Sequence, residues 1–174
     1  MTRPITTTTR ATDSTYGHQI KSGAATRSLV GMLRTNGSTQ FYSSAAELGV
    51  ISYYNRRSRA VTTTVTGSGS SSTTMVSAIS QNIICWGGEG AIHQVTGNAF
   101  NSTAGAFCIT YATYDGASLG QTTIAKSVVA NDRTPVSTGY AISPTEGFHT
   151  FGAGIAVNTG SGGWDITVST LVRN

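Results

Sequence analysis

The chain has 174 residues, a formal net charge of +4 and only 10% charged residues, against about 25% in ordinary soluble domains. The length is enough for one domain with a substantial core, and the many Ser, Thr and Gly residues disfavour helices. The charge is too sparse for the dense basic stripes of a nucleic-acid binder, and no apolar stretch predicts a signal peptide or a membrane span.

The N-terminal segment, residues 1–26, is polar and carries single apolar residues at no fixed period. This pattern predicts an extended N-terminal arm, followed by one folded domain over residues 27–174. Such an arm can cover a wide surface of a partner when it becomes ordered on binding. Residues 28–35 then predict the first buried strand, which ends at the turn signal of Asn36 and Gly37.

The next part of the chain mixes short apolar runs with a flexible-looking segment. Residues 43–48 contain the one Ala-Ala-Glu-Leu stretch of the chain and predict a single helical turn. Residues 50–54 and 59–66 predict strands, because Val61 and Val65 alternate with Thr. Residues 67–72 are all Gly and Ser and predict a flexible loop.

The middle of the chain consists of short segments rich in β-branched and aromatic residues, which are typical of strands. In the segment from Phe107, the side chains of Phe107, Ile109 and Tyr111 fall on one face. Many short strands separated by turn signals, such as residues 87–90 and 115–116, indicate a β-sandwich or barrel. The predicted strands are residues 75–79, 82–86, 91–95, 107–114, 124–130 and 138–142.

The C-terminal stretch has the clearest pattern. In its first half, larger apolar residues occupy every second position from Phe151 to Val157, and the alternation resumes at Trp164, Ile166 and Val168. Each half therefore predicts a strand with one apolar face. A Gly-rich break separates the two halves, so they predict a terminal β-hairpin with a longer loop.

Two cysteines, Cys85 and Cys108, lie in apolar runs and belong to no Cys-x-x-Cys pair. This context predicts two buried free thiols rather than a zinc site or a disulfide. Free thiols are compatible with assembly in a reducing cytoplasm.

The residues that could perform chemistry are scattered. Asp115, Asp132 and Asp165 lie beside turn residues, where a carboxylate caps the backbone. The histidines are isolated, and neither a nucleophile elbow nor a phosphate-binding loop is present. The sequence therefore predicts no catalytic residue, no metal ligand, no cofactor and no enzymatic activity. The three isolated histidines are His18, His93 and His149.

Arginine is the residue type that we expect to contact a partner. Three arginines cluster within four positions after Tyr53 and Tyr54, and three more occur near the N-terminus. They could form a solvated turn, or they could reach a carboxylate of a neighbouring subunit in a bidentate pair. The candidate partner-binding residues are Arg3, Arg10, Arg27, Arg56, Arg57 and Arg59.

Two blocks of the sequence resemble known structural modules. The first comprises SLVGMLRT (residues 28–35), QFYSS (residues 40–44) and VISYYNRRSR (residues 50–59). It resembles a block found in small virion proteins of tailed bacteriophages. The second, residues 146–171, is similar to the final hairpin of jelly-roll or tumour-necrosis-factor-like knobs, which occur in phage decoration proteins, head fibres and tail fibres.

The resemblance implies an antiparallel β-sandwich of jelly-roll type that assembles as a homotrimer. It implies a capsid decoration (cement) protein of the virion, with a tail fibre tip or receptor-binding knob as the alternative, and it carries over no catalytic residue. The expected partners are further copies of the chain and the major capsid protein or another virion protein. No nucleic acid, membrane or small-molecule substrate is expected, and the expected location is the virion, assembled in the host cytoplasm.

Overall fold

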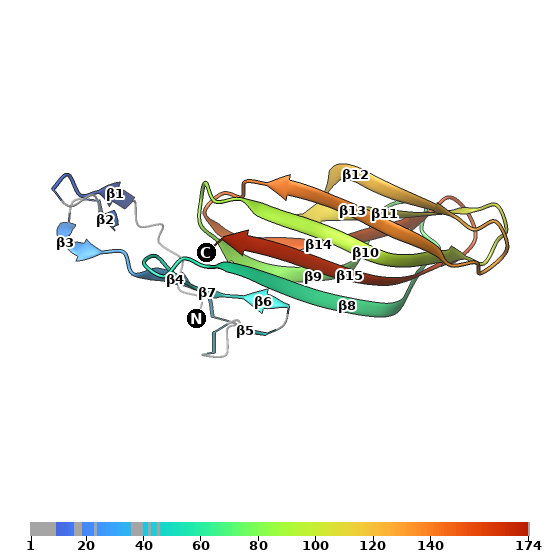
Figure 1. Cartoon of the computed structure of the whole chain (residues 1–174), viewed down its shortest axis with the longest axis horizontal. Coiled ribbons are helices and arrows are strands. Elements are labelled where there is room, and N and C mark those ends of the chain that lie inside the picture. Colours follow the sequence, from blue (N-terminus) through green and yellow to red (C-terminus); the bar gives the residue numbers. More distant parts are fainter. Residues whose placement is uncertain are drawn as a thin grey trace.

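The protein is an all-β molecule in the part of the chain that the structure describes (Figure 1). The structure is a computed structural model and describes residues 10–15, 19–22, 24–35, 40–41, 43–44 and 46–173. The strands are β1 (Arg10–Thr12), β2 (Gln19–Lys21), β3 (Ala24–Ser28), β4 (Gly31–Leu33), β5 (Ser43–Ser44), β6 (Glu47–Leu48), β7 (Val50–Ser52), β8 (Ser58–Ser70), β9 (Val76–Cys85), β10 (Ala91–Asn101), β11 (Phe107–Tyr114), β12 (Ala117–Lys126), β13 (Thr134–Ile142), β14 (Gly147–Val157) and β15 (Gly162–Arg173).

Eight long strands, β8 to β15, form the body of the molecule as two sheets. One sheet has the order β13-β10-β15-β8, and the other has the order β12-β11-β14-β9-β6-β5. Pairing among the eight long strands is antiparallel, whereas the short β6 lies parallel to β9. The sheets pack face to face, and each of the two buried apolar clusters contains residues from both sheets. The sequence prediction of an antiparallel β-sandwich is confirmed.

The apolar alternation of the last two strands is confirmed, and their predicted pairing is wrong. The residues that carry the alternation are buried as expected: Phe151, Ala153, Ile155, Val157, Trp164, Ile166 and Val168. However, β14 pairs with β11 and β9, while β15 pairs with β10 and β8. The two strands lie in different sheets, so their apolar faces meet across the core. The connection of residues 158–161 can cross the gap of about 10 Å between sheets, since four residues span up to about 13 Å.

The centre of the sandwich is built around Trp164. Its side chain is fully buried, and its indole Nε1 donates a hydrogen bond of 3.0 Å to Thr110 Oγ1. Trp164 lies in β15 and Thr110 in β11, so this bond joins the two sheets. The buried neighbours on β11, Cys108 and Ala112, are small, which leaves room for the indole ring.

Strand β11 has the bounds that the sequence predicts, but its larger side chains face outward. Phe107, Ile109 and Tyr111 share one face as expected, and each is at least partly exposed. The buried side chains are the smaller ones between them, Cys108 and Thr110 among them. Alternation defines two faces but not which one is covered, and here the volume of Trp164 selects the small face.

Two N-terminal predictions are corrected by the structure. Residues 28–35 do not form a buried strand: β4 covers only Gly31–Leu33, pairs with β7, and leaves Leu33 60% exposed. Residues 43–48 do not form a helical turn but contribute β5 and β6. The backbone groups of β6 pair with β9 instead of closing a turn of helix, which explains the difference.

Segment boundaries in the middle of the chain also change. The predicted loop of residues 67–72 is mostly strand, because β8 continues to Ser70 opposite Gly162 after a bulge near Gly67. The predicted strands 75–79 and 82–86 are one continuous strand, β9. Val128 and Val129, predicted in a strand, lie exposed in the connection after β12. The turns at residues 87–90 and 115–116 are present as predicted.

The described residues of the predicted N-terminal arm form a small antiparallel sheet, β1-β2-β3. In Figure 1 this sheet lies beyond one end of the sandwich, on the side of β4 and β7. Residues 1–9 lie outside the described residues. The division into an arm of residues 1–26 and a domain of residues 27–174 stays a prediction.

A buried polar network joins the two sheets beside the apolar core. His93 is fully buried, with Nε2 2.8 Å from the carbonyl oxygen of Gly152 and Nδ1 2.8 Å from Thr170 Oγ1. The Thr170 hydroxyl also lies 2.7 Å from Gln81 Oε1. The Gln81 amide donates in turn to two backbone carbonyls, of Val61 and Val168, at 2.9 Å each. His93 is therefore a structural residue in contact with both sheets.

We expect His93 to make the fold sensitive to acid. Burial lowers the pKa of His93 below 6.5, and the hydrogen bond to Gly152 opposes this only in part. The imidazole of His93 then binds a proton at a higher pH in the unfolded chain than in the folded chain. The contribution of neutral His93 to the free energy of unfolding is therefore fully present above pH 6.5 and is lost as the pH falls below that value. Urea unfolding between about pH 8 and pH 5 should show this loss. The variant His93→Gln should show a flatter pH profile, and an unchanged profile would contradict the assignment.

Candidate partner-binding site

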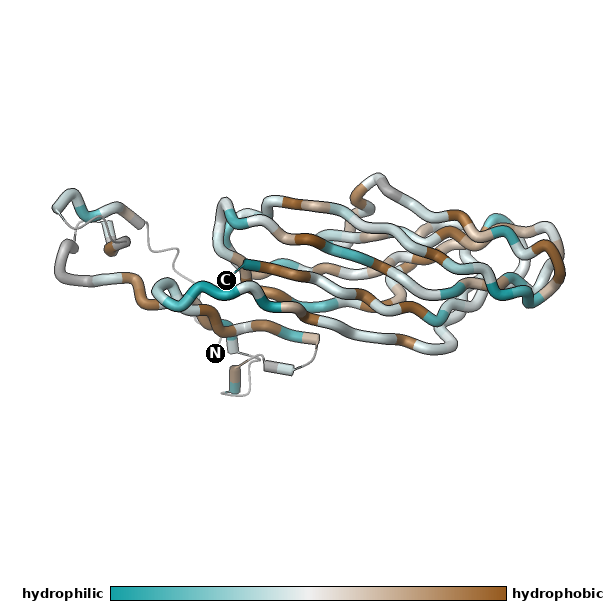
Figure 2. The backbone as a smooth tube through the Cα atoms, in the orientation of Figure 1, coloured by the Kyte–Doolittle hydropathy of each residue, from teal (hydrophilic) through white to brown (hydrophobic). Residues whose placement is uncertain are grey.

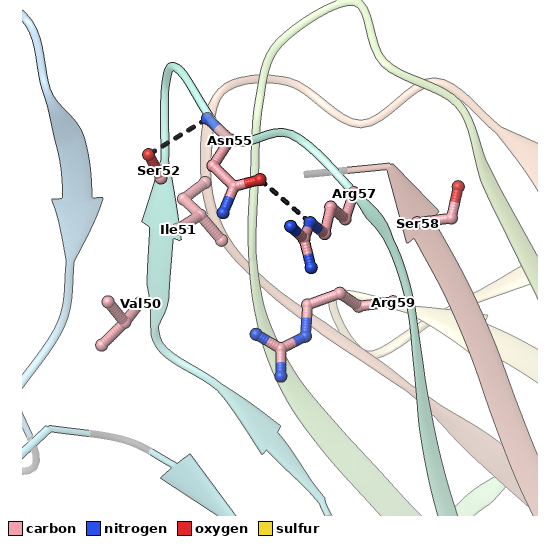
Figure 3. A pocket seen from close by; sticks show the side chains of 7 residues that line it. All are labelled: Val50, Ile51, Ser52, Asn55, Arg57, Ser58 and Arg59. Atoms are coloured by element: carbon pink, nitrogen blue, oxygen red, sulfur yellow. Dashed lines mark hydrogen bonds between the residues drawn. The ribbon is translucent and has the colours of Figure 1, made fainter.

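The connection between β7 and β8 is the most hydrophilic stretch at its end of the sandwich (Figure 2). Three of the six candidate arginines lie in it or at the start of β8. It borders a pocket of about 470 Å³ between β7 and β8 (Figure 3). The pocket is lined by Val50, Ile51, Ser52, Asn55, Arg57, Ser58 and Arg59.

Arg57 and Arg59 supply the charge of this pocket. In Figure 3 both guanidinium groups project from the chain into the space beside β7. Arg57 Nε donates a hydrogen bond of 2.9 Å to Asn55 Oδ1, which fixes the direction of the side chain. Among the described residues, neither arginine forms an ion pair with a carboxylate. Both guanidinium groups keep donors available for a ligand.

Arg56, in the same run, has a different role. Its Nη1 lies 2.7 Å from Glu89 Oε1, and its guanidinium lies 4.5 Å from the ring centre of Tyr53 and 5.2 Å from that of Trp86. Arg173 approaches the same carboxylate, with Nε 3.9 Å from Glu89 Oε2. Arg56 is thus neutralised within the chain and covers buried Trp86.

The walls of the pocket combine apolar and hydroxyl groups. Val50 is 46% exposed, whereas the next residue, Ile51, is buried in the adjoining apolar cluster. Ser52 Oγ accepts a hydrogen bond of 3.3 Å from the backbone N–H of Asn55, which shapes the turn at one side. An open pocket with two guanidinium groups and an apolar wall can receive an anionic group attached to an aliphatic chain.

The remaining candidate residues are not assembled at this pocket by the described structure. Arg3 lies outside the described residues, and Arg10 and Arg27 lie in β1 and β3, where only the backbone is described. Sequence reasoning missed Val50, Ile51, Ser52 and Asn55 as pocket residues. The Arg run was visible in the sequence, but the pairing of β7 with β4 and the path of β8 were not.

The acidic residues named from the sequence act largely on the backbone. Asp115 Oδ1 accepts the N–H of Thr150 at 2.8 Å, and its Oδ2 lies 2.9 Å from His149 Nδ1. Asp165 Oδ1 accepts the N–H of Gly67 at 2.8 Å. This bond, with help from Arg133, lowers the pKa of Asp165. Asp115 lies in a turn and accepts a backbone N–H, as predicted. The turn role predicted for Asp165 is wrong, because Asp165 lies within β15 and accepts its N–H from the paired strand β8.

The predicted thiols are confirmed, since Cys85 and Cys108 are buried and form no disulfide. Burial, and to a smaller extent the charge of Asp115, raises the pKa of Cys85 to about 12. Across the described ranges, no group of three or more His, Cys, Asp or Glu side chains is arranged to hold a metal ion. In the same residues, no helix has the length and apolar character needed to cross a membrane.

Comparison with known proteins gives a match in structure but not in sequence. No protein-family model matches the chain, and no curated protein matches it significantly. The chain is similar to a chain in the structure of infectious bursal disease virus, Gx strain, with a TM-score of 0.51 and 12% identity, over 84% of this chain and 38% of that one. A VP2 subviral particle of the same virus gives a TM-score of 0.48 and 13% identity, over 71% of this chain and 34% of the other.

A lower similarity extends to the insecticidal delta-endotoxin Cry8Ea1 from Bacillus thuringiensis, with a TM-score of 0.38 and 7% identity, over 61% of this chain and 19% of that chain. The chain spans less than two fifths of the length of each of these proteins. At these identities the likeness concerns the fold. The chain therefore shares an antiparallel β-sandwich fold with a chain of the infectious bursal disease virus structure.

Proposed function

We propose that this chain is a virion structural protein whose sandwich is of jelly-roll type, and that it acts as a trimeric capsid decoration protein of a tailed bacteriophage. The observation that carries the proposal is the nesting of the strand pairs. Among the eight long strands, the first pairs with the last, the second with the seventh, the third with the sixth and the fourth with the fifth. These pairs are β8 with β15, β9 with β14, β10 with β13 and β11 with β12.

This nesting corresponds to one long hairpin wrapped into two sheets, the arrangement of a jelly roll with two Greek keys. Jelly rolls are frequent in viral capsid and lectin domains. The similarity in fold to the infectious bursal disease virus structure supports the hypothesis of a virion structural protein. A fold does not fix a function by itself, so the neutral composition is the second support: only 10% charged residues suits a surface that other subunits cover.

Attachment would depend on burial of surface rather than on chemistry, and the protein would not be an enzyme. Three copies would sit together on the shell, where obligate interfaces commonly bury about 2,000–5,000 Å². The N-terminal arm of residues 1–26 would reach the major capsid protein or another virion protein. Repeated copies at symmetry-related positions would compensate for modest individual contacts through effective concentration.

Reconstitution on particles that lack the protein tests this proposal. The full chain should sediment as a trimer and should bind to depleted particles. A chain that begins at residue 25 should remain a trimer, because β8 to β15 form the core without the arm, but it should no longer bind. A monomeric full chain, or normal occupancy by the truncated chain, would contradict the trimer or the arm, respectively.

A tail fibre tip or receptor-binding knob is the second candidate, and one feature favours it. Four connections, residues 71–75, 102–106, 127–133 and 158–161, come from one end of the sandwich, opposite β4 and β7 (Figure 1). Backbone hydrogen bonds hold three of them together: Ser102 N–H to Ser161 O at 2.8 Å and Gly105 N–H to Ser127 O at 2.7 Å. Such an end could face a host receptor. Copy number separates the candidates, since a fibre tip is far less abundant in a particle than a decoration protein.

A further inference from the structure

The pocket between β7 and β8 holds more positive charge than the described chain neutralises. Arg57 and Arg59 both line it, and neither has an ion-pair partner among the described residues. Glu89, an acidic residue at this end of the sandwich, is already engaged by Arg56 and Arg173. We propose that this pocket binds the carboxylate groups of an acidic segment in a partner protein.

The comparison with Arg56 supports this assignment. Three arginines occur within four positions, yet Arg56 alone meets a carboxylate and covers aromatic rings. The other two project into one open volume (Figure 3), where their like charges repel each other. An anion placed between them would remove that repulsion and gain two charge-assisted hydrogen-bonding partners.

The geometry of the donors suits a carboxylate. The bond from Arg57 Nε to Asn55 Oδ1 holds the guanidinium plane and leaves its two Nη groups for a ligand. An oriented guanidinium binds a carboxylate through two parallel N–H donors and loses less entropy on binding than a free side chain. The Arg59 guanidinium can provide a second pair of donors on the same volume.

The surroundings favour an acidic protein segment over a nucleic acid. Val50 and Ile51 give the pocket an apolar wall that can pack against the methylene groups of Asp or Glu side chains. Nucleic-acid sites combine a longer basic stripe with aromatic rings free to stack. Here the Tyr53 ring is already packed edge-on against Trp86 and covered by Arg56. Tyr54, which is 61% exposed, supplies a single ring beside the arginine run and not a series of stacking rings.

This inference deepens the proposed function and rests on it for the source of the acidic segment, which would belong to the virion protein that the chain contacts. Its chemistry can be tested on the full chain without particles. If the chain did not bind an acidic peptide, the proposed role in the virion would be unaffected. If the chain did not attach to particles, the binding of carboxylates in the pocket would be unaffected.

Fluorescence anisotropy with a labelled hexaglutamate peptide at low salt provides the test. The double variant Arg57→Gln/Arg59→Gln should weaken binding at least about tenfold. The charge-matched control Lys126→Gln/Arg133→Gln, which changes residues of β12 and of the connection to β13, should change it less than about twofold. Absence of binding to the unmodified chain, or equal losses in the two variants, would overturn the proposal. A single-stranded oligothymidylate of equal charge that binds more tightly and loses affinity in the same variant would also overturn it.

A measurement on the unmodified chain removes any dependence on the folding of the variants. Titration with hexaglutamate should shift the Nε–Hε nuclear magnetic resonance signals of Arg57 and Arg59. The signal of Arg133, which is paired with Asp165, should stay in place. Unmoved signals from both pocket arginines would overturn the proposal.

Discussion

Replacing Trp164 by alanine should lower the free energy of unfolding by about 3–5 kcal/mol. The indole is fully buried between the sheets, and it packs among small residues of β11 that cannot expand to fill the space. The change also removes the bond from the indole N–H to Thr110 Oγ1 and leaves that hydroxyl buried without this donor. Chemical denaturation followed by far-ultraviolet circular dichroism measures the loss.

Two further variants separate the loss of buried ring volume from the loss of the hydrogen bond and provide an exposed control. Trp164→Phe keeps most of the ring volume and should lose less stability than the alanine variant, with the missing hydrogen bond costing about 1–3 kcal/mol. Leu171→Ala, on the same strand but 41% exposed, should change stability by no more than about 1 kcal/mol. A Trp164→Ala curve that overlays the wild-type curve would place the indole outside the core.

Replacing Gly97 by alanine should cost about 2–4 kcal/mol, although it adds only one methyl group. Gly97 has a φ of 151°, which residues with a Cβ rarely adopt. A Cβ at this position would also overlap the carbonyl oxygen of Asp165 and lie 2.8 Å from Ile166 Cα. Both obstacles are backbone atoms of the paired strand β15, so no side chain can move aside. Urea unfolding midpoints would report the loss.

Gly88 provides the matched control for that prediction. It also has a positive φ, of 80°, but a Cβ there would meet no atom within 4 Å. Gly88→Ala should therefore show only the conformational cost, about 1–2 kcal/mol. Equal losses at the two positions would mean that the close approach of β10 to β15 contributes nothing to the effect at Gly97.

The parts of the fold that could be predicted from the sequence are those with local causes. The bounds of β11 agree with the prediction, because apolar alternation begins at Phe107 and stops before the turn of Asp115 and Gly116. The burial of Trp164 and Phe151 follows from the same alternation. Each of these features depends on residues that are neighbours in the chain.

The errors arise where a distant strand decides the outcome. Alternation in the last two strands predicts two apolar faces, but whether these lie side by side or face each other depends on β9, β10 and β11. The Gly-Ser run after Val65 is extended because β15 pairs with it as far as Gly162 opposite Ser70. Glycines at that end of β15 permit the close packing, since a Cβ on Gly163 would overlap the ring of Phe100.

In the candidate site, too, features with local causes could be predicted and those that depend on distant residues could not. The run of arginines could be recognised from the sequence, but the different roles within it could not. Arg56 is neutralised by Glu89, which lies 33 positions away, whereas Arg57 is held by Asn55, two positions away. Only the tertiary structure separates Arg56, which is ion-paired within the chain, from Arg57 and Arg59, which have no ion-pair partner among the described residues.

A cryo-electron microscopy map of the intact particle would show directly whether the chain is a trimeric decoration protein of the capsid. We expect this sandwich to occur in groups of three at symmetry-related positions on the outer capsid surface. In each group, density from the N-terminal residues should run onto the neighbouring virion protein. A particle without this protein in its ordered shell, or one that carries it as isolated single copies without contacts to the shell, would contradict the proposed function.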